Sequence, residues 1–312
     1  MDNLVVCINA VMPLLITMLL GFAARRLGML GDNEITKMNS AAFFFFVPCL
    51  LFDSIYSADI STAINIKLLL YTSLGMTAVF FAGILAARKI TGDRKKQSVV
   101  LLGIFRSNCA ILGMPLALNL IPDGDISAAA VLIVVVGLVS NVLAVVCMSM
   151  FSGERQRIGA VLWDMVKNPL LIGSGLGILF AGLGWRLPGF AERVVSDFAL
   201  VSSPLLLFLL GASFKFEGVE QNGRELWFIC VTRLLLVPAI FLPLGWFMGF
   251  RGVEMAGLIA AFASPAAVTS FTLAQQMDGD VNLAGNMVIF TSALCPLTLF
   301  GWCMLAKIIG AL

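Results

Sequence analysis

Polar residues that can bind an anion stand in the middle of one long apolar stretch, residues 98–121. They comprise a cation, a hydroxyl and an amide, followed by two residues that weaken helices: Arg106, Ser107, Asn108, Gly113 and Pro115. Guanidinium, hydroxyl and amide groups all donate hydrogen bonds that a carboxylate can accept. Proline lacks an N–H group and clashes with the preceding helical turn, so a break in this helix is expected.

A second apolar stretch, residues 253–276, has the same character. Its polar and helix-breaking residues are Ser264, Pro265, Thr269 and Ser270. A broken helix exposes unpaired N–H groups at one half and unpaired carbonyls at the other, and the positive dipole end suits an anion. The alternative is an ordinary kink, in which Ser and Thr bond their own backbone. Two such interruptions at related positions favour a substrate-binding site.

Charged residues in the interior of apolar stretches need a separate explanation. A central membrane arginine costs at least about 2.5–3.5 kcal/mol on insertion scales. Arg106 could therefore bind an anionic substrate, pair with a carboxylate or snorkel to the interface, and for Arg233 we favour snorkelling. Asp53 and Asp197 are the carboxylates deepest in apolar stretches. Either could carry a coupling proton, although both could also lie near the outer surface.

The elements that position these residues are membrane helices. Sixty per cent of the 312 residues are hydrophobic and 12% are charged, against about 25% charged in soluble domains. The lipid bilayer is thus the expected environment, and apolar runs of about 20 residues predict an all-α integral membrane protein. We expect ten spans near 4–24, 37–57, 66–87, 98–121, 127–151, 160–182, 190–214, 225–249, 253–276 and 282–308.

Lysine and arginine are unevenly distributed between the two sides of these predicted spans. Thirteen follow odd-numbered spans and five lie on the opposite side, with Arg106 and Arg233 inside spans. Basic loops are retained in the cytoplasm. Both termini are therefore predicted outside, in a multi-pass protein of the cell (plasma or inner) membrane.

The chain repeats itself with a shift of 156 residues. The shift aligns Pro13 with Pro169, Gly21 with Gly177, Gly28 with Gly184, Pro48 with Pro204 and Phe52 with Phe208. Residues 1–151 and 152–312 then form two repeats of five spans each, and an odd number inverts the second repeat. Inverted repeats with discontinuous helices are typical of secondary transporters. With a shift of 157, Asn108 aligns with Pro265, so spans four and nine are expected to break and cross.

The chain lacks the residues that several classes of function require. The chain has no histidine, and its seven cysteines lack CxxC spacing, so no metal site, disulfide or cofactor is predicted. There is no P-loop sequence to bind ATP and nothing that predicts nucleic-acid binding. Asp123–Asp125 and Asp278–Asp280 could suggest a Mg²⁺ site in an intramembrane enzyme, but inversion places them on opposite faces. Tight turns explain them better.

Segments along the whole chain resemble the auxin efflux carrier family, which includes bacterial malate- or malonate-type permeases and the plant PIN-formed carriers. The resembling segments are Pro13 with Gly21 and Arg25–Leu30, Val47–Phe52, Arg106–Pro115, Asn168–Pro169, Ser203–Gly211 and Ser264–Ala274. The resemblance implies scaffold and transport domains, a substrate near the crossing of helices four and nine, and a substrate contact at Asn108. Pro115 and Pro265 match its crossover prolines.

The function that these features predict is secondary transport of small organic anions, in particular carboxylates, by alternating access. Neither the coupling ion, H⁺ or Na⁺, nor the oligomeric state follows from the sequence, and a homodimer is one option. An anion-conducting channel is the first alternative, but no continuous polar stripe is present. An intramembrane enzyme is the second, and the chain lacks the histidine or paired carboxylates that it would need.

Overall fold

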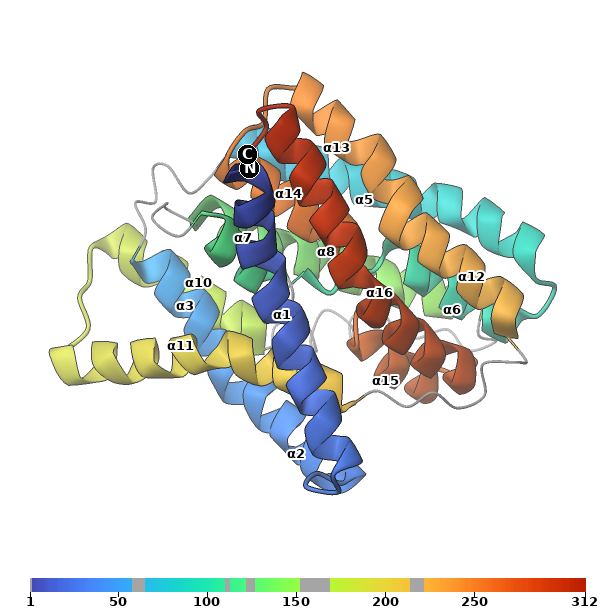
Figure 1. Cartoon of the computed structure of the whole chain (residues 1–312), viewed down its shortest axis with the longest axis horizontal. Coiled ribbons are helices and arrows are strands. Elements are labelled where there is room, and N and C mark those ends of the chain that lie inside the picture. The colour runs from blue at the N-terminus through green and yellow to red at the C-terminus, as the bar shows by residue number, and fades with distance from the viewer. Residues whose placement is uncertain (1, 58–64, 110–112, 122–126, 152–168, 214–221) are drawn as a thin grey trace.

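The computed structural model describes residues 2–57, 65–109, 113–121, 127–151, 169–213 and 222–312 (Figure 1). Its regular elements within these ranges are helices, joined in one place by an isolated β-bridge. They are α1 Asp2–Arg26, α2 Asp32–Ala41, η1 Ala42–Phe46, α3 Val47–Tyr56, α5 Ile66–Ile90, α6 Arg94–Phe105, α7 Met114–Leu120, α8 Ser127–Phe151, α10 Pro169–Leu183, α11 Gly189–Ala212, α12 Gly223–Val231, η4 Thr232–Leu236, α13 Val237–Phe247, α14 Val253–Ala263, α15 Thr269–Gln276 and α16 Val281–Ile308. The segments η1 and η4 are π-helical turns inside longer helices.

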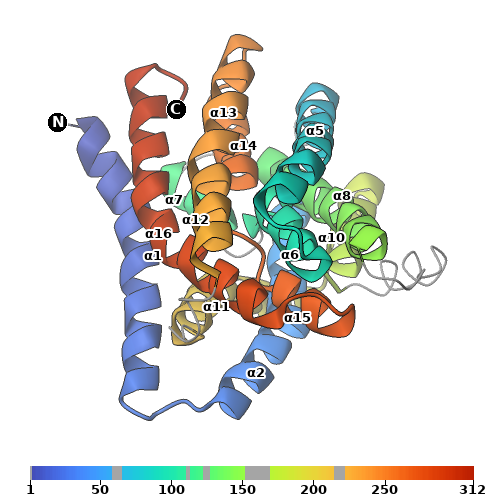
Figure 2. The same cartoon turned by 90° about the vertical axis from the view of Figure 1, so that its right-hand side faces the viewer.

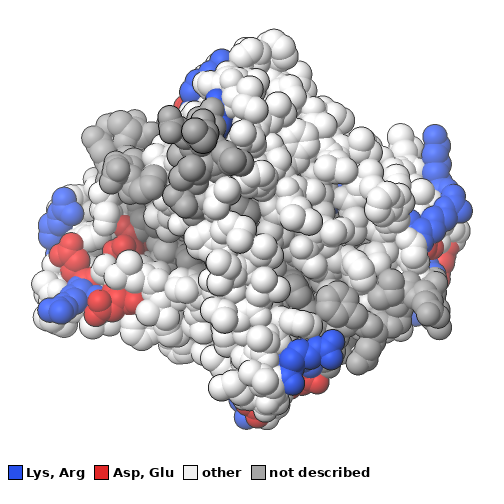
Figure 3. All heavy atoms as spheres, viewed as in Figure 1, with Lys and Arg blue, Asp and Glu red and all other residues white. Residues whose placement is uncertain are grey.

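Six helices among the described residues are long and apolar enough to cross a membrane. They are Asp32–Asp53, Ile66–Ile90, Ala128–Phe151, Gly189–Ala212, Gly223–Phe247 and Val281–Ile308. In the view of Figure 3, Lys, Arg, Asp and Glu gather at the margins and leave a broad uncharged surface between them. An apolar outer surface on long helices is what a lipid environment requires. The expectation of an all-helical, multi-pass membrane protein is therefore confirmed.

The predicted spans four and nine are interrupted in the structure. The helix α6 ends at Phe105 and α7 begins at Met114, while α14 ends at Ala263 and α15 begins at Thr269. The span predicted at 37–57 begins earlier, at Asp32. Residues 152–168 lie outside the described part, and with them the repeat boundary and the start of span six. Asp123–Asp125 also lie outside it, so the count of ten spans stays a prediction.

Glycines bring two pairs of helices into close contact. A Cβ atom at Gly21 of α1 would lie 1.8 Å from the carbonyl oxygen of Phe208 in α11. One at Gly177 of α10 would lie 3.1 Å from the carbonyl oxygen of Phe52 in α3. Small residues allow membrane helices to pack this closely. A shift of 156 residues, the spacing found in the sequence, relates Gly21 to Gly177 and Phe52 to Phe208. The two contacts therefore occupy equivalent positions of the two predicted repeats, and each is made between one repeat and the other.

Charged and polar groups join the helix ends at two ends of the molecule. At one end, Arg25 donates to the Ala212 carbonyl at 2.9 Å, and Lys96 lies 3.8 Å from Glu225. At the other end, the Gly252 N–H donates to the Ala311 carbonyl at 2.9 Å. Figures 1 and 2 both place the two chain termini at this end, and Figure 2 shows α1 and α16 side by side. An even number of membrane crossings would bring the two termini to the same end in this way.

Candidate functional site

The two interrupted helices meet through their backbones at the centre of the molecule. The Asn108 N–H donates to the Pro265 carbonyl at 2.8 Å, and the Ala267 N–H donates to the Arg106 carbonyl at 3.1 Å. These bonds form an antiparallel bridge centred on Ser107 and Ala266. The helix α6 packs against α15, and α7 packs against α14. The carboxyl ends of α6 and α14 thus approach the same crossing point.

Proline and threonine explain why the chain stays extended at the crossing. Pro265 has no N–H group, so it cannot continue the hydrogen bonding of α14. The next N–H group, that of Ala266, donates instead to the Thr291 hydroxyl of α16 at 3.1 Å. Ser264, which ends α14, has extended backbone angles, φ −68° and ψ 156°. The interruption is therefore stabilised by contacts from another helix.

Arg233 lies beneath the crossing and does not reach an interface. Its side chain is 1% exposed. Its Nε donates to the Ser264 carbonyl at 2.8 Å and its Nη2 to the Ala261 carbonyl at 2.9 Å. Its Nη1 approaches the carbonyls of Ile104 and Phe105 at 3.3 and 3.4 Å. The interpretation of Arg233 as a snorkelling residue is wrong, because the ends of two helices surround its guanidinium group.

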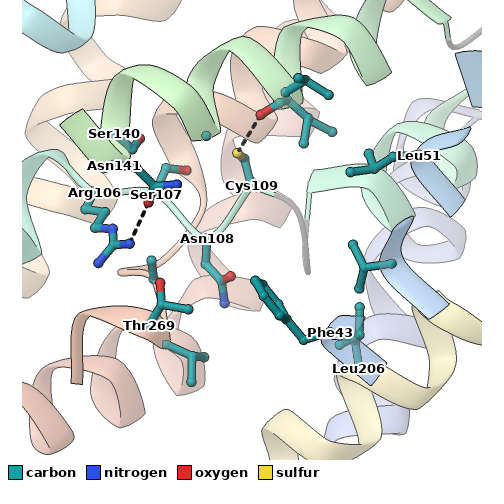
Figure 4. A pocket seen from close by; sticks show the side chains of 16 residues that line it. Phe43, Leu51, Arg106, Ser107, Asn108, Cys109, Ser140, Asn141, Leu206 and Thr269 are labelled. Carbon is teal, nitrogen blue, oxygen red and sulfur yellow. Dashed lines mark hydrogen bonds between the residues drawn. The ribbon is translucent and has the colours of Figure 1, made fainter. Parts of the chain in front are cut away.

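A cavity of about 120 Å³ lies beside the crossing (Figure 4). A cavity of about 150 Å³ can hold a benzene molecule, so this volume suits a small ligand. Its walls come from η1, α3, α8, α11, the extended segment after α6 and the start of α15. The lining residues are Phe43, Val47, Leu51, Arg106, Ser107, Asn108, Cys109, Ile133, Val134, Gly137, Ser140, Asn141, Leu206, Ala267, Val268 and Thr269.

Arg106 contributes a buried cation with unused hydrogen-bonding capacity to this cavity. Its side chain is 7% exposed, which excludes snorkelling. Its Nη2 donates to the Asn141 side-chain oxygen at 2.8 Å, whereas Nη1 has no partner among the described residues. The ion pairs of the described residues do not include Arg106. Asn108 likewise has a buried Nδ2 without a partner in the described part of the chain.

The structure brings four of the predicted site residues together at the cavity: Arg106, Ser107, Asn108 and Thr269. Figure 4 shows the Asn108 side chain extending from the crossing segment toward the side where Thr269 and Phe43 lie. The other predicted residues are absent from the lining: Gly113, Pro115, Ser264, Pro265 and Ser270. Of these, Gly113 is packed so closely that a Cβ atom would lie 2.6 Å from the Ala260 Cβ. Ser264 and Pro265 supply carbonyls to Arg233 and Asn108.

The candidate coupling carboxylates lie away from the cavity. Asp53 is half-buried near the end of α3, and Asp197 is exposed on α11. Neither is among the residues that line the cavity. Their assignment to a coupling proton stays a prediction.

The sequence reasoning did not identify Ser140 and Asn141 of α8 as site residues. Asn141 holds one end of the Arg106 guanidinium group, and the Ser140 hydroxyl is buried without a partner among the described residues. Their position, as two adjacent polar residues in the middle of an apolar helix, could have indicated that they belong to the site. The apolar walls, formed in part by Phe43, Leu51 and Leu206, carried no such signal, because apolar residues are common along the whole chain.

A second cavity, of about 540 Å³, lies on the other side of the start of α15. It shares Val268 with the first cavity and extends to Arg25 and Asp32 at one end of the molecule. Asn282 and Asn286 of α16 also line it. The first turn of α15 thus separates a small central cavity from a larger one that has charged residues at one end.

Comparison with known proteins identifies the chain as a membrane transport protein. The model of a family described as "Membrane transport protein" matches residues 6–303. An uncharacterized transporter of Methanothermobacter thermautotrophicus is 24% identical over 298 residues, covering 94% of this chain and 96% of the relative. An uncharacterized transporter of Methanocaldococcus jannaschii is 23% identical over 310 residues, covering 95% and 98%. The chain therefore belongs to this membrane transport family, the auxin efflux carriers that its sequence segments resemble.

Proposed function

We propose that this transporter carries small organic anions, in particular carboxylates, bound at the central cavity. One observation supports this most directly: two buried donors, Arg106 Nη1 and Asn108 Nδ2, have no partner among the described residues, at the point where two broken helices cross. Membrane transporters commonly bind their substrates at such interruptions. The proposed contacts are Arg106, Ser107, Asn108 and Thr269, together with Asn141, which orients Arg106.

The energetics of these donors favour an anionic ligand. A buried donor without a partner costs about 1–3 kcal/mol, and a charged one costs more. A carboxylate brings two acceptor oxygens and one negative charge, so it can occupy both donors and neutralise Arg106. A neutral ligand would leave the charge of Arg106 uncompensated in a low-dielectric site. One cation among largely apolar walls matches one carboxylate attached to an apolar body.

The proposed mechanism is alternating access around the crossing, with ten spans arranged as two inverted repeats of five. The exchanged contacts of Gly21 with Phe208 and Gly177 with Phe52 support the repeat. A further contact agrees with it, because Ser202 donates to the carbonyl of Phe46, its own counterpart under the shift of 156, at 2.6 Å. Aligned glycine and proline positions in the sequence point to the same symmetry.

The second cavity supports a route from the site to one side of the membrane. It ends at Arg25 and Asp32, in the loop after span one that the charge distribution places in the cytoplasm. We propose that it is the cytoplasmic vestibule, and that the first turn of α15 closes or opens its connection to the site. Both termini would then lie on the outer side of the cell membrane.

Uptake into proteoliposomes distinguishes a carrier from a channel. We expect saturable uptake of some members of a panel of labelled mono- and dicarboxylates, tested with and without H⁺ and Na⁺ gradients. Unlabelled substrate loaded inside should accelerate entry of labelled substrate, because a carrier exchanges substrates. Non-saturating flux without such exchange would favour the channel, and chemical conversion of the added acid would favour an enzyme.

The matched variants for this assay are Asn108→Ala and Asn119→Ala. Both remove an amide from the interrupted fourth span, but only Asn108 lines the cavity. We expect Asn108→Ala to abolish saturable uptake while its thermal unfolding stays close to that of the wild type. Uptake should persist in Asn119→Ala. Wild-type uptake kinetics in Asn108→Ala would overturn the proposed site.

A further inference from the structure

Arg233 stands where the negative ends of two interrupted helices meet. Its guanidinium group donates to the carbonyls of Ile104 and Phe105 at the end of α6, and to those of Ala261 and Ser264 at the end of α14. It comes from the π-helical turn η4, which lies in a third helix. No ion pair recorded for the described residues involves Arg233. Backbone carbonyls are therefore its ligands.

The breaks in the two helices create the carbonyls that Arg233 binds. In a continuous helix the Ile104 carbonyl would accept from the N–H group of Asn108, but that group donates to the Pro265 carbonyl instead. The Ala261 carbonyl would accept from residue 265, which is a proline without an N–H group. Both carbonyls receive their hydrogen from Arg233. The guanidinium group thus replaces the donors that were lost at the crossing.

The charges also match. A helix carries about half a negative charge at its carboxyl end, so two converging ends amount to about one negative charge. A guanidinium group carries one positive charge and remains protonated under all ordinary conditions. In carriers with broken helices, carboxyl ends and unwound carbonyls of this kind coordinate the coupling cation. Here a side chain of the protein fills that position.

We propose that Arg233 is a tethered substitute for a coupling cation, so that this transporter works without Na⁺ at its crossing. The inference extends the proposed function by assigning its ion dependence. Because Arg233 is 1% exposed and absent from the lining of either cavity described, it cannot exchange with solvent as a diffusible ion would. It also leaves Arg106 as the cation available to an anionic substrate. The arrangement predicts that removal of Arg233 opens a cation site.

Thermal unfolding of the purified full chain tests this without any substrate. Arg233→Gln removes the charge and retains a polar side chain, whereas Arg233→Lys retains the charge. Each protein is unfolded in N-methyl-D-glucamine chloride, then with added Na⁺, K⁺ or guanidinium at about 20 mM. We expect the Tm of Arg233→Gln to rise by about 2–4 °C with one of these ions, as for a ligand that binds the folded state. Wild type and Arg233→Lys should not respond.

The control is Arg251→Gln. Arg251 also donates to two carbonyls, those of Trp246 and Phe250, both at 2.7 Å, but it lies exposed at a helix end. Its variant should show no ion-specific rise in Tm. An equal rise in the wild type, no rise in Arg233→Gln, or failure of Arg233→Gln to fold in every salt would each overturn the inference. A failed uptake assay with carboxylates would instead count against the proposed function and leave these measurements unaffected.

Discussion

The two buried arginines at the crossing differ in how far their guanidinium groups are occupied. Arg233 donates to carbonyls from two helix ends and lines neither of the cavities described. Arg106 donates to Asn141, and its Nη1, beside a cavity, has no partner in the part of the chain that the structure describes. Both carry the cost of a buried charge, but within the described ranges all the donor nitrogens of the guanidinium group are satisfied at Arg233 and not at Arg106. This difference supports the roles that we propose, structural for Arg233 and ligand-binding for Arg106.

Replacing each arginine with methionine should separate these roles most clearly. Arg233→Met leaves four carbonyls without their donor, at about 1–3 kcal/mol for each one that stays unpaired, so a large fall in Tm is expected. Arg106→Met removes a charge that has no ion-pair partner among the described residues, so its Tm should stay within a few degrees of the wild type or rise. Thermal unfolding in one detergent and one salt measures both. Equal decreases in Tm for Arg233→Met and Arg106→Met would contradict the different roles proposed for the two arginines.

Arg106→Gln should then weaken substrate binding while the protein remains folded. Hydrogen bonds to charged groups contribute about 1.5–3 kcal/mol, which corresponds to a loss of affinity of roughly 10- to 150-fold. The concentration of carboxylate that gives half-maximal uptake in proteoliposomes measures this change. The matched control is Arg224→Gln at the start of α12, which is exposed and outside the cavity lining. Unchanged half-saturation in Arg106→Gln would contradict the role of Arg106.

Asn141→Asp should sharpen the comparison by giving Arg106 a negatively charged partner within the protein. The new carboxylate would stand where the Asn141 oxygen now accepts from Nη2 at 2.8 Å. Arg106 would then be neutralised in the protein, as Arg233 is by its helix ends, and an anionic substrate would meet a second negative charge. We expect a loss of affinity close to that of Arg106→Gln, whereas Asn141→Leu should lose less. Competition of unlabelled carboxylate with labelled substrate provides the measurement.

The smallest effect is expected from Trp302→Phe. The Trp302 indole N–H donates to the Leu234 carbonyl at 2.9 Å, inside the π-helical turn that carries Arg233. Losing one hydrogen bond of this kind costs about 1 kcal/mol, so Tm should fall by a few degrees. Half-saturation for uptake should stay unchanged, because Arg106 and its partners are elsewhere. A change in substrate affinity without a change in Tm would show that the two arginine environments are coupled.

The sequence predicted the position of the crossing because the interruptions depend on local chemistry. Pro265 cannot donate a backbone hydrogen bond, and Arg106 to Asn108 form a polar cluster within an apolar stretch. The helix ends at Phe105 and Ala263 follow from these residues. The membrane class followed equally directly from the scarcity of charge along the chain.

The different fates of Arg106 and Arg233 could not be predicted from the sequence. Both are single arginines inside apolar stretches, and their local sequences do not show which one lies below the crossing. The partners of Arg233 are backbone carbonyls about 30 and 130 positions away, as far as Ile104. Backbone carbonyls have no signature in the sequence. Which of the predicted polar residues face the cavity, such as Thr269 but not Ser270, likewise depends on the packing of other helices.

The proposed function depends on recognition of the negative charge of the substrate by Arg106. The most direct test compares uptake of a carboxylic acid with uptake of its neutral primary amide, in the wild type and in Arg106→Gln, as competition against the same labelled substrate. We predict that the wild type prefers the carboxylate strongly and that Arg106→Gln loses most of this preference. An undiminished preference for the carboxylate in a folded Arg106→Gln protein would contradict this role of Arg106.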